Sequence, residues 1–467
     1  MNVAVFHMAK FLPFISILFL IGCSSVEKNS SSTVYFAGEI VNPTSDYVVL
    51  FKDDIAIDSA KLDSKNRFSF KLDSINEGLH HFNHNPELQY VFFEKGDSIL
   101  TRLNTVDFDE SLAFSGKGEE INNFLADIFL THEQEASYIH SLFKIEPKQF
   151  CQKTDSLRNQ KIMDLMDVQA NTLLSENALE MAKASIDYNY YIYREKYPYY
   201  HKRKSGEKTF HKLPEEFYAY RKDLSFNNKN LAYFRPYYNF MKYHYGNLSF
   251  KDCSHKCDIE NGIVKNNLHF YQHKLKLIDS CVKQKNLRDN LFRNVAVDYL
   301  LKHDDEKNNN IFIENFHEFS ANNKHIKEIN LLYENIKKIQ PSNEIPSLLV
   351  YNTEGAEIQL RDIGSSKKTV FYFWSGTQKR HFENITNRIA VLSDKYPDYR
   401  FVGINVKTDS ERWLTMLDSK GLDKTNQFRA SNYKEVAHTM IVYSTNKAFI
   451  VEKGVIVDAF ANLYSSF

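Results

Sequence analysis

Alternating apolar and polar positions mark the first part of the chain, from residue 33 to residue 117. In the segment NRFSFKLD, Phe68, Phe70 and Leu72 point to one side of an extended chain, and the polar residues between them point to the other. Similar runs, such as TVYFAGEIV and LQYVFFE, are separated by turn-forming stretches such as NPTSD and EKGD. The pattern predicts an antiparallel β-sandwich of about six to eight short strands over residues 33–117.

The hydrophobic period becomes that of an α-helix over residues 118–340. The segment EINNFLADIF places four apolar residues at i, i+3, i+4 and i+7, namely Ile121, Phe124, Leu125 and Ile128. The middle of this helical region is rich in tyrosine, in DYNYYIYREKYPYYHK and YFRPYYNFMKYHYG. Two interpretations stay open. The tyrosines either fill helix–helix contacts with their hydroxyls in water, or they line a groove for a sugar or a peptide.

The last segment, residues 341–467, has a mixed α/β pattern. Continuous apolar runs at 369–374 and 401–406 are typical of buried parallel strands, and a helix predicted from residue 378 joins them in a right-handed crossover. The runs KAFIVE and GVIVDAF, on either side of Lys453 and Gly454, predict a closing antiparallel hairpin. We therefore expect a multidomain α+β protein with a β-sandwich, a helical middle region and a C-terminal α/β domain.

The N-terminal segment indicates in which cellular compartment the protein resides. It reads MNVAVFHMAKFLPFISILFLIGCSS. Its apolar run is too short for a comfortable membrane span and is typical of a signal peptide, which we place at residues 1–22. The ending Leu20-Ile21-Gly22-Cys23 resembles the bacterial lipobox, and this resemblance implies that Cys23 is lipidated and anchors the protein to a membrane. Residues 23–32 then form a polar tether. We expect a lipid-anchored cell-envelope protein, with the outer membrane favoured.

Charge and cysteine content narrow the classes of function. The 59 basic and 59 acidic side chains balance, which gives no electrostatic case for nucleic-acid binding. The cysteines after Cys23 are Cys151, Cys253, Cys257 and Cys281, too few for a disulfide-built scaffold. No cofactor motif is present.

The segment CSHKC places Cys253 and Cys257 on one face of a predicted helix. This spacing suits a disulfide, two ligands of a metal site, or two buried thiols. Because no second ligand pair lies nearby in the sequence, we assign no metal site. The segment HHFNH places His80 and His84 on one face of a strand, and we expect them to be surface histidines.

Residues 341–467 contain four segments in a characteristic order: IPSLLVYNTEGAEIQLRDI, FYFW, FVGINV and KEVAHTMIVYSTNKAFIVEKGVIV. In order and spacing this segment resembles the membrane-anchored thiol–disulfide oxidoreductases of the TlpA and ResA type, which implies a thioredoxin-like fold. The runs of residues 33–117 resemble the small β domain that opens many envelope lipoproteins of the Bacteroidetes type.

The resemblance fails at the residues that carry the family's chemistry. The positions that match the two redox cysteines are Gln378 and His381, and the position that matches the cis-proline is Asn446. Thiol–disulfide exchange needs a thiolate and a second thiol, and a cis bond before a residue other than proline costs about 3 kcal/mol. We therefore expect no catalytic residue here and a trans bond at Asn446. A hydrolytic pair of Ser375 or Thr377 with His381 would lack an orienting carboxylate.

The expected function is a non-catalytic binding or scaffolding module for an envelope protein or peptide. One alternative is a thiol–disulfide oxidoreductase that acts through Cys253 and Cys257. Another is a glycan- or peptide-binding lipoprotein that uses the tyrosine-rich region. The sequence leaves the partner, the membrane face and the oligomeric state open.

Overall fold

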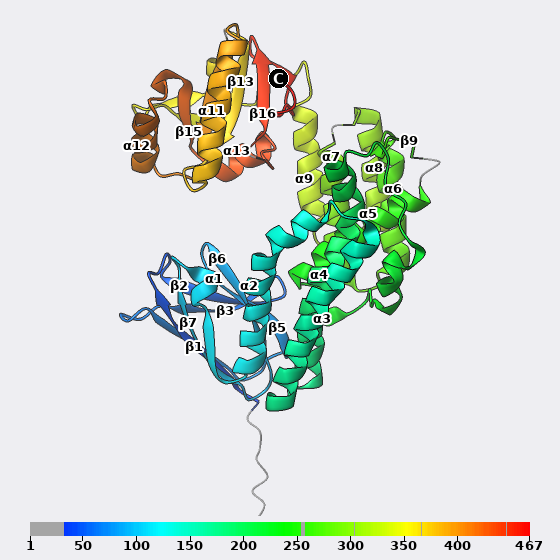
Figure 1. Ribbon diagram of the computed structural model, residues 1–467. Coiled ribbons are helices and arrows are strands. Elements are labelled where there is room, and N and C mark those ends of the chain that lie inside the picture. The colour runs from blue at the N-terminus through cyan, green and yellow to red at the C-terminus, as the bar shows by residue number, and fades with distance from the viewer. Residues whose placement is uncertain (1–31, 254–256, 303, 366, 445) are drawn as a thin grey trace, which may run out of the picture.

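The computed structural model describes residues 32–253, 257–302, 304–365, 367–444 and 446–467 (Figure 1). The predicted signal peptide and most of the predicted tether, including Cys23, lie outside the described residues. The chain is a mixed α/β protein with several sheets, which confirms the coarse fold class. Within the described residues, none of the helices combines the length and the apolar character that crossing a bilayer requires.

Two four-stranded sheets occupy the N-terminal segment. One has the order β4-β1-β7-β8 and the other the order β3-β2-β5-β6. Phe36 of the first sheet contacts Phe82 and Phe93 of the second, with ring centroids 5.4 and 5.3 Å apart, so the aromatic core lies between the sheets. The strands are β1 Val34–Val41, β2 Tyr47–Lys52, β3 Ile55–Lys61, β4 Arg67–Leu72, β5 Gly78–His84, β6 Glu87–Phe93, β7 Ser98–Asn104 and β8 Ala113–Lys117.

The prediction of a purely antiparallel sandwich was wrong at one pair of strands. β1 and β7 run parallel, with Phe36 opposite Ile99 and Ile40 opposite Leu103. Between these strands the chain forms one strand of the same sheet, β4, and four strands of the other sheet. It therefore re-enters beside β1 in the same direction, as parallel neighbours joined by a long crossover do.

Helices form the middle of the chain, and the longest connection between them, from α4 to α5, contains two 3-10 helices. The apolar residues predicted for the first long helix face inward, because Ile121, Phe124 and Ile128 are buried. The helices are α1 Phe108–Ser111, α2 Glu119–Leu142, α3 Pro147–Thr172, α4 Glu176–Ser205, α5 Arg235–Asp252, α6 Asn267–Cys281, α7 Lys285–Leu300, α8 Glu306–Phe319 and α9 Ile326–Lys338, with the 3-10 helices η1 Glu215–Asp223 and η2 Lys229–Leu231 and the small hairpin β9 Ile259–Glu260 and β10 Ile263–Val264.

A buried carboxylate joins α4, η1 and α5. Glu195 of α4 is 0% exposed and accepts two bonds from Arg221, at 2.9 and 2.5 Å. Tyr220 Oη donates to it at 2.7 Å, His244 Nδ1 lies 3.0 Å away, and Asn247 Nδ2 donates at 2.5 Å. Because a buried charge needs such partners, this network fixes how the three elements pack.

The C-terminal segment forms a seven-stranded sheet of order β12-β11-β15-β14-β13-β16-β17. β13 is parallel to β14 and antiparallel to β16. A hairpin, a βαβ unit, a helix and a final hairpin follow in the thioredoxin order, and the additional strand β15 was not predicted. The elements are β11 Leu349–Tyr351, β12 Glu357–Gln359, α10 Leu360–Ile363, β13 Thr369–Trp374, α11 Lys379–Lys395, β14 Arg400–Asn405, α12 Ser410–Lys420, η3 Lys424–Asn426, β15 Gln427–Ala430, α13 Tyr433–Thr439, β16 Ala448–Glu452 and β17 Val455–Asp458.

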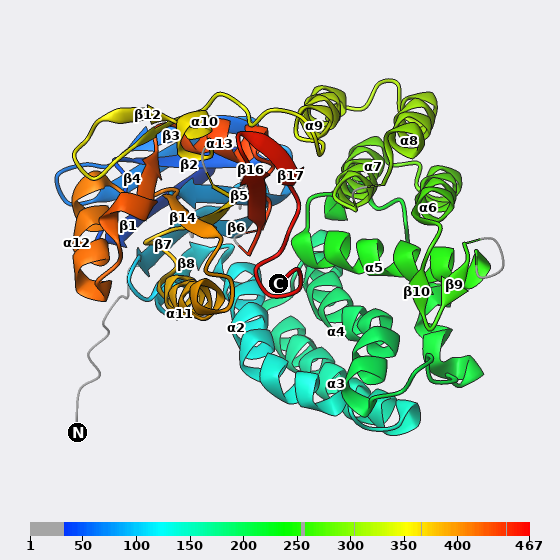
Figure 2. The same ribbon diagram turned by 90° about the horizontal axis from the view of Figure 1, so that it is seen from above.

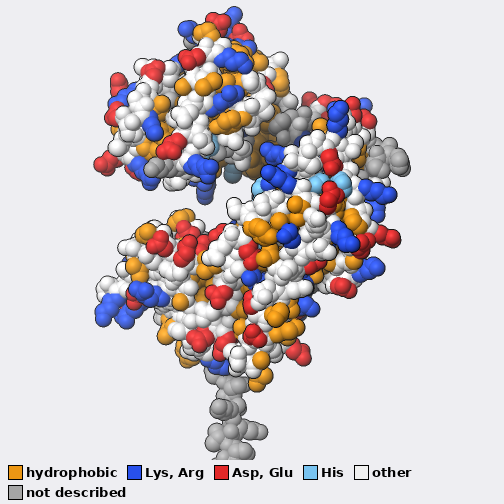
Figure 3. All heavy atoms as spheres, viewed as in Figure 1, with side chains coloured by type: hydrophobic (Ala, Val, Ile, Leu, Met, Phe, Trp, Pro, Cys, Tyr) orange, Lys and Arg blue, Asp and Glu red, His pale blue; other side chains and the backbone are white. Residues whose placement is uncertain are grey.

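The C-terminal sheet has a core on each face. On one face, Trp374 and Phe382 pack with Trp413 of α12. The other face belongs to a large core that continues through the helices to Leu79 and Phe92 of the N-terminal sheet. Figure 2 shows the sheets and the helical region from above, and in Figure 3 the N-terminal and C-terminal lobes face each other across a hollow.

Candidate functional site

The candidate site is the turn between β13 and α11, which we call the elbow (residues 374–382). All six residues of β13 are buried, which fixes the strand in the centre of the sheet. At its end the Trp374 ring stacks on Phe382, with centroids 4.5 Å apart, and Trp374 Nε1 donates to Gln427 Oε1 at 3.2 Å. Aromatic packing therefore holds the end of the strand to the helix, and the buried hydrogen bond ties it to Gln427 at the start of β15.

The tip of the elbow is held by Arg412 of α12 and by Thr408, which lies two residues before this helix. Gly376 N donates to Thr408 Oγ1 at 2.8 Å, and Arg412 donates to Gly376 O at 3.0 Å. A Cβ at Gly376 would lie 2.8 Å from both Met416 Sδ and Thr408 Cγ2, so only glycine fits here without movement. The geometry of the turn is thus built into the fold, although no thiol lies in it.

The structure places the residues that match the redox cysteines at the start of α11. Gln378 is exposed and precedes the first helical residue, while His381 is half-buried in the first turn. Asn446 lies on the loop before β16, and its carbonyl accepts from Leu463 N at 3.0 Å. The hydroxyl of Ser375 meets Thr377 Oγ1 at 2.9 Å. His381 and Asn446 line one open groove.

This groove, which we call the elbow groove, measures about 760 Å³. It runs along α11 and is closed on the other side by the loop before β16 and by the C-terminal tail. Arg388 Nε donates to Leu463 O at 2.8 Å, which leaves the rest of its guanidinium over the Tyr464 ring. The lining residues are Arg380, His381, Asn384, Asn387, Arg388, Val391, Asn446 and Tyr464, among which there is no carboxylate. The groove offers positive charge, amide groups and two exposed apolar side chains.

A buried lysine supports the loop that carries Asn446. Lys447 Nζ donates to the carbonyls of Met440 and Ile441 at 2.6 and 3.1 Å and lies 4.4 Å from the centre of the Phe460 ring. Burial lowers the pKa of Lys447 to about 7, and Asp458 opposes this only in part. The ammonium group therefore joins the residues that follow α13 to the loop that carries Asn446.

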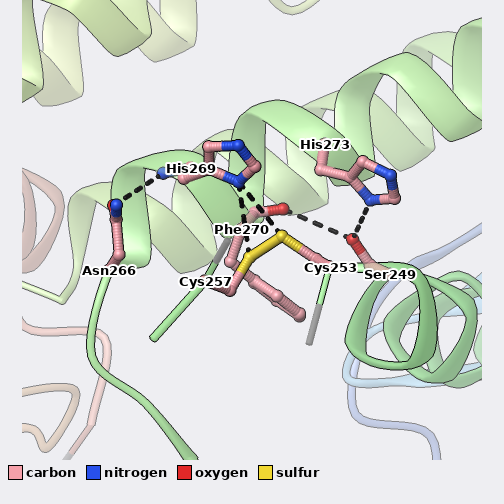
Figure 4. The surroundings of a disulfide bond; sticks show 7 residues. All are labelled: Ser249, Cys253, Cys257, Asn266, His269, Phe270 and His273. Carbon is pink, nitrogen blue, oxygen red and sulfur yellow. Dashed lines mark hydrogen bonds between the residues drawn. A yellow bond between two sulfur atoms is a disulfide. The ribbon is translucent and has the colours of Figure 1, made fainter. Parts of the chain in front are cut away.

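The disulfide partners lie away from the elbow. Cys253 follows α5 and forms a disulfide with Cys257, and His269 Nδ1 of α6 lies 3.0 Å from Cys253 Sγ and 3.5 Å from Cys257 Sγ (Figure 4). The two cysteines are 2% and 0% exposed. Figures 1 and 2 both show the neighbouring β9 at the opposite side of the molecule from α11. His255, between the cysteines, lies outside the described residues.

The free cysteines do not supply a thiol to the elbow either. Cys151 belongs to α3 and Cys281 ends α6, both in the helical region. Burial raises the pKa of the Cys151 thiol to about 11, so little of it is thiolate at neutral pH. The elbow thus lacks a thiol both in sequence and, among the described residues, in space.

The tyrosines of the helical region are largely core residues. Tyr197, Tyr237 and Tyr245 are fully buried, which supports the packing interpretation. The expectation that the hydroxyls stay in water was wrong for several of them, because Tyr197 Oη donates to Ile145 O at 2.6 Å and Tyr237 Oη donates to Ser225 O at 2.8 Å. Backbone carbonyl groups in the connections between helices accept hydrogen bonds from these hydroxyls.

Some tyrosines do reach a cavity, of about 810 Å³, between β6 and the helices α2, α4 and α5. Tyr90, Tyr188 and Tyr193 contribute to its lining, so a glycan- or peptide-binding groove stays a prediction.

The expectation of surface histidines at His80 and His84 was wrong. Both side chains are 1% exposed. His84 Nε2 accepts from Thr44 N at 3.0 Å, and His80 Nδ1 lies 2.9 Å from Gly78 O. Both side chains are buried in the N-terminal segment and form hydrogen bonds with neighbouring backbone groups.

Comparison with solved structures gives similar proteins for about a quarter of the chain. A domain of a possible thiol-disulfide isomerase from Cytophaga hutchinsonii is 23% identical, covers 27% of this chain and 86% of its own, and has a TM-score of 0.23. A thiol:disulfide interchange protein from Bacteroides sp. is 17% identical over 26% of this chain and 80% of its own, with a TM-score of 0.23. The thioredoxin domain of a thiol-disulfide oxidoreductase from Bacteroides vulgatus is 17% identical over 25% and 86%, with a TM-score of 0.21. No known protein family matches the chain, and no curated protein does. The thioredoxin architecture therefore rests on the strand order described above.

Several residues of the elbow groove were missed by sequence reasoning. Arg388 and Tyr464 are far apart in the chain, and only the fold brings them together. Arg380 lies in the first turn of α11, but its place in a groove depends on the loop of Asn446. Lys447 resembles an ordinary surface lysine in sequence, and no local signal reveals that it is buried.

Proposed function

We propose that the C-terminal domain is a non-redox binding module that holds an extended peptide of an envelope partner in the elbow groove. The observation that carries this proposal is the combination of an intact elbow, clamped at Trp374 and Gly376, with a lining that has no thiol. We infer that an elbow whose geometry is intact without the reactive residues serves to bind a partner and not to catalyse a reaction.

The chemistry of the groove favours an acidic or carboxylate-bearing peptide. Arg380 and Arg388 supply guanidinium groups, which pair with carboxylates through charge-assisted hydrogen bonds. The amides of Asn384, Asn387 and Asn446 can bond to peptide backbone in either direction. Val391 and Tyr464 offer apolar contacts at the rim.

Fluorescence anisotropy with short labelled peptides of matched length tests this proposal. We expect the purified protein to bind glutamate-rich peptides more tightly than lysine-rich ones, and a rise in salt to weaken binding. The substitution Arg380→Glu should lower the affinity about tenfold or more, because a hydrogen bond to a charged group contributes about 1.5–3 kcal/mol.

The matched control is Lys434→Glu, which makes the same change of charge at an exposed position of α13 outside the groove. This variant should bind as the unmodified protein does. Equal loss in both variants, or equal affinity for acidic and basic peptides, would contradict a specific role of the elbow groove.

A second candidate function is thiol–disulfide exchange at Cys253 and Cys257. It is favoured by His269 Nδ1, which lies close to both sulfurs. In the reduced pair, this nitrogen could accept a proton from either thiol and so favour the thiolate. The burial of both sulfurs opposes it, because exchange needs in-line access to one of them. Thiol trapping followed by mass spectrometry separates the two functions, since a structural disulfide stays oxidised under mild reductant.

We further propose that the protein is lipid-anchored in the cell envelope through Cys23. The support is the lipobox-like ending of the apolar N-terminal run and the polar stretch after it. Metabolic labelling with a palmitate analogue should mark the protein, and Cys23→Ala should remove the label.

A further inference from the structure

A cluster of two histidines and two carboxylates lies at the end of α4, away from the elbow. His201 lies just before the last turn of α4, Glu207 and His211 follow in the connection after this helix, and Glu146 precedes α3. Glu207 Oε1 is 3.5 Å from His201 Nε2 and 3.0 Å from His211 Nδ1. One ligand atom from each of these three residues lies within 4.8 Å of the others. The three side chains therefore converge on one point.

The inner histidine presents a bare nitrogen to this point. His201 is 2% exposed, and its Nδ1 donates to Phe143 O at 2.8 Å. A proton held at Nδ1 leaves the lone pair at Nε2, and Nε2 has no hydrogen-bond partner among the described residues although it is buried. Histidines that bind metal ions are fixed in this way, with the second nitrogen donating to a carbonyl or a carboxylate.

The outer histidine has a corresponding partner. His211 Nε2 lies 3.3 Å from Glu146 Oε2. When that nitrogen donates to the carboxylate, His211 Nδ1 carries the lone pair and faces Glu207.

We propose that His201 Nε2, Glu207 Oε1 and His211 Nδ1 bind one Zn²⁺ ion, with Glu146 orienting His211. Bonds of 2.0–2.2 Å from zinc to nitrogen and oxygen place the ligands of a tetrahedron about 3.3 Å apart. The two distances of 3.5 and 3.0 Å lie on either side of this value. Three protein ligands leave a fourth position for water, and Glu207 and His211, whose side chains are 34% and 29% exposed, open it to solvent.

The charges around the cluster favour a divalent cation. The carbonyl end of a helix carries partial negative charge, and His201 lies close to this end of α4. Two carboxylates add to it. Lys202 Nζ donates to Asn261 O and Lys204 Nζ donates to His140 O, so these two ammonium groups are engaged elsewhere. A bound ion would tie the turn between α2 and α3 to the end of α4 and the connection after it.

Zinc titration of the full chain tests the proposal, with protein that carries no polyhistidine tag, is stripped by a chelator and keeps its disulfide oxidised. Isothermal calorimetry or competition with a chromophoric chelator should give one tightly bound Zn²⁺ per chain. Glu207→Gln and His211→Ala, both at partly exposed positions, should each weaken this binding about 100-fold or more, and Glu146→Gln about tenfold. Co²⁺ in place of zinc should give the visible bands of a tetrahedral site, and these bands should disappear in His211→Ala.

The matched control is His269→Ala, which removes the histidine beside Cys253 and Cys257 and should leave zinc binding unchanged. Circular dichroism of each stripped variant shows whether it is folded. Loss of binding in His269→Ala alone, absence of a saturable equivalent in the unmodified chain, or unchanged affinity in Glu207→Gln and His211→Ala would overturn the proposal. The cluster would then be an ion pair between histidine and glutamate.

Discussion

The buried carboxylate of Glu195 gives the sharpest test of how the helical region is held together. Glu195→Gln keeps the shape of the side chain and removes its charge. It leaves the guanidinium of Arg221 without a counter-ion, where that side chain is only 16% exposed. Removing one partner of a buried ion pair costs about 3–5 kcal/mol, so we expect a loss of stability of this size at neutral pH.

The pH dependence follows from the same network. Burial alone would raise the pKa of Glu195, but the bonds from His244 and Arg221 outweigh it and lower the pKa from 4.5 to about 2. A shift of this size corresponds to about 3 kcal/mol of stability. This contribution is present above pH 4.5 and is lost as the pH falls through the folded pKa. About 2 kcal/mol of it should be lost between pH 6 and pH 3.

Hydrogen exchange measured by mass spectrometry on peptides of α4 and α5 reports the local opening free energy and suits a chain with several domains. Between pH 6 and pH 3 the unmodified protein should lose protection of its amides against exchange in α4 and α5. The variant Glu195→Gln, which lacks this protection already at pH 6, should change little. The matched control is Glu328→Gln, because Glu328 pairs with Arg293 at sites that are both 37% exposed and should contribute at most about 1 kcal/mol. Equal effects of the two substitutions, or the same pH slope in Glu195→Gln and the unmodified protein, would refute the reasoning.

Three further predictions concern the elbow and the free thiols. Between pH 7 and 10.5 the unmodified protein should gain stability relative to Lys447→Met, by up to about 1.4 kcal/mol per pH unit, because the unfolded chain binds a proton that the folded one has released. Urea midpoints that change equally in both proteins between pH 7 and pH 9 would contradict this. Gly376→Ala should destabilise the protein by about 1–3 kcal/mol, whereas Gly246→Ala, which meets open space on α5, should stabilise it by about 0.5–1 kcal/mol; thermal melting that shifts the same way in both would contradict the crowding at the elbow. In alkylation followed by mass spectrometry, exposed Cys281 should react well before Cys151, whose pKa burial raises to about 11; equal rates would contradict the burial of Cys151.

Periodicity was enough to predict which kind of secondary structure dominates each segment. The run 369–374 became β13 with unchanged ends, and the buried stripe of α2 could be read from four apolar positions. These signals are local, because each side chain shows its own preference for water or core. The parallel pairing of β1 with β7 escaped prediction because it depends on the crossover and not on either strand alone.

The chemistry of the candidate sites was only partly predictable. The absence of sulfur at Gln378 and His381 could be read from the sequence, because it needs only the alignment of a strand, a turn and a helix. His201, Glu207 and His211 could not be found in this way, since their spacing matches no common metal motif and the bond to Phe143 appears only in the fold. Buried Lys447 was hidden for the same reason.

The central claim, that the elbow is intact but has no redox chemistry, is tested most directly by insulin reduction. The unmodified protein and the variant Gln378→Cys/His381→Cys are compared at equal concentration, with Cys253→Ser/Cys257→Ser as the control that locates any remaining activity. We expect the unmodified protein to match the blank, and the restored variant to form a disulfide across the elbow and to reduce insulin above that level. Turnover by the unmodified protein would contradict the account, as would a restored variant that forms no disulfide.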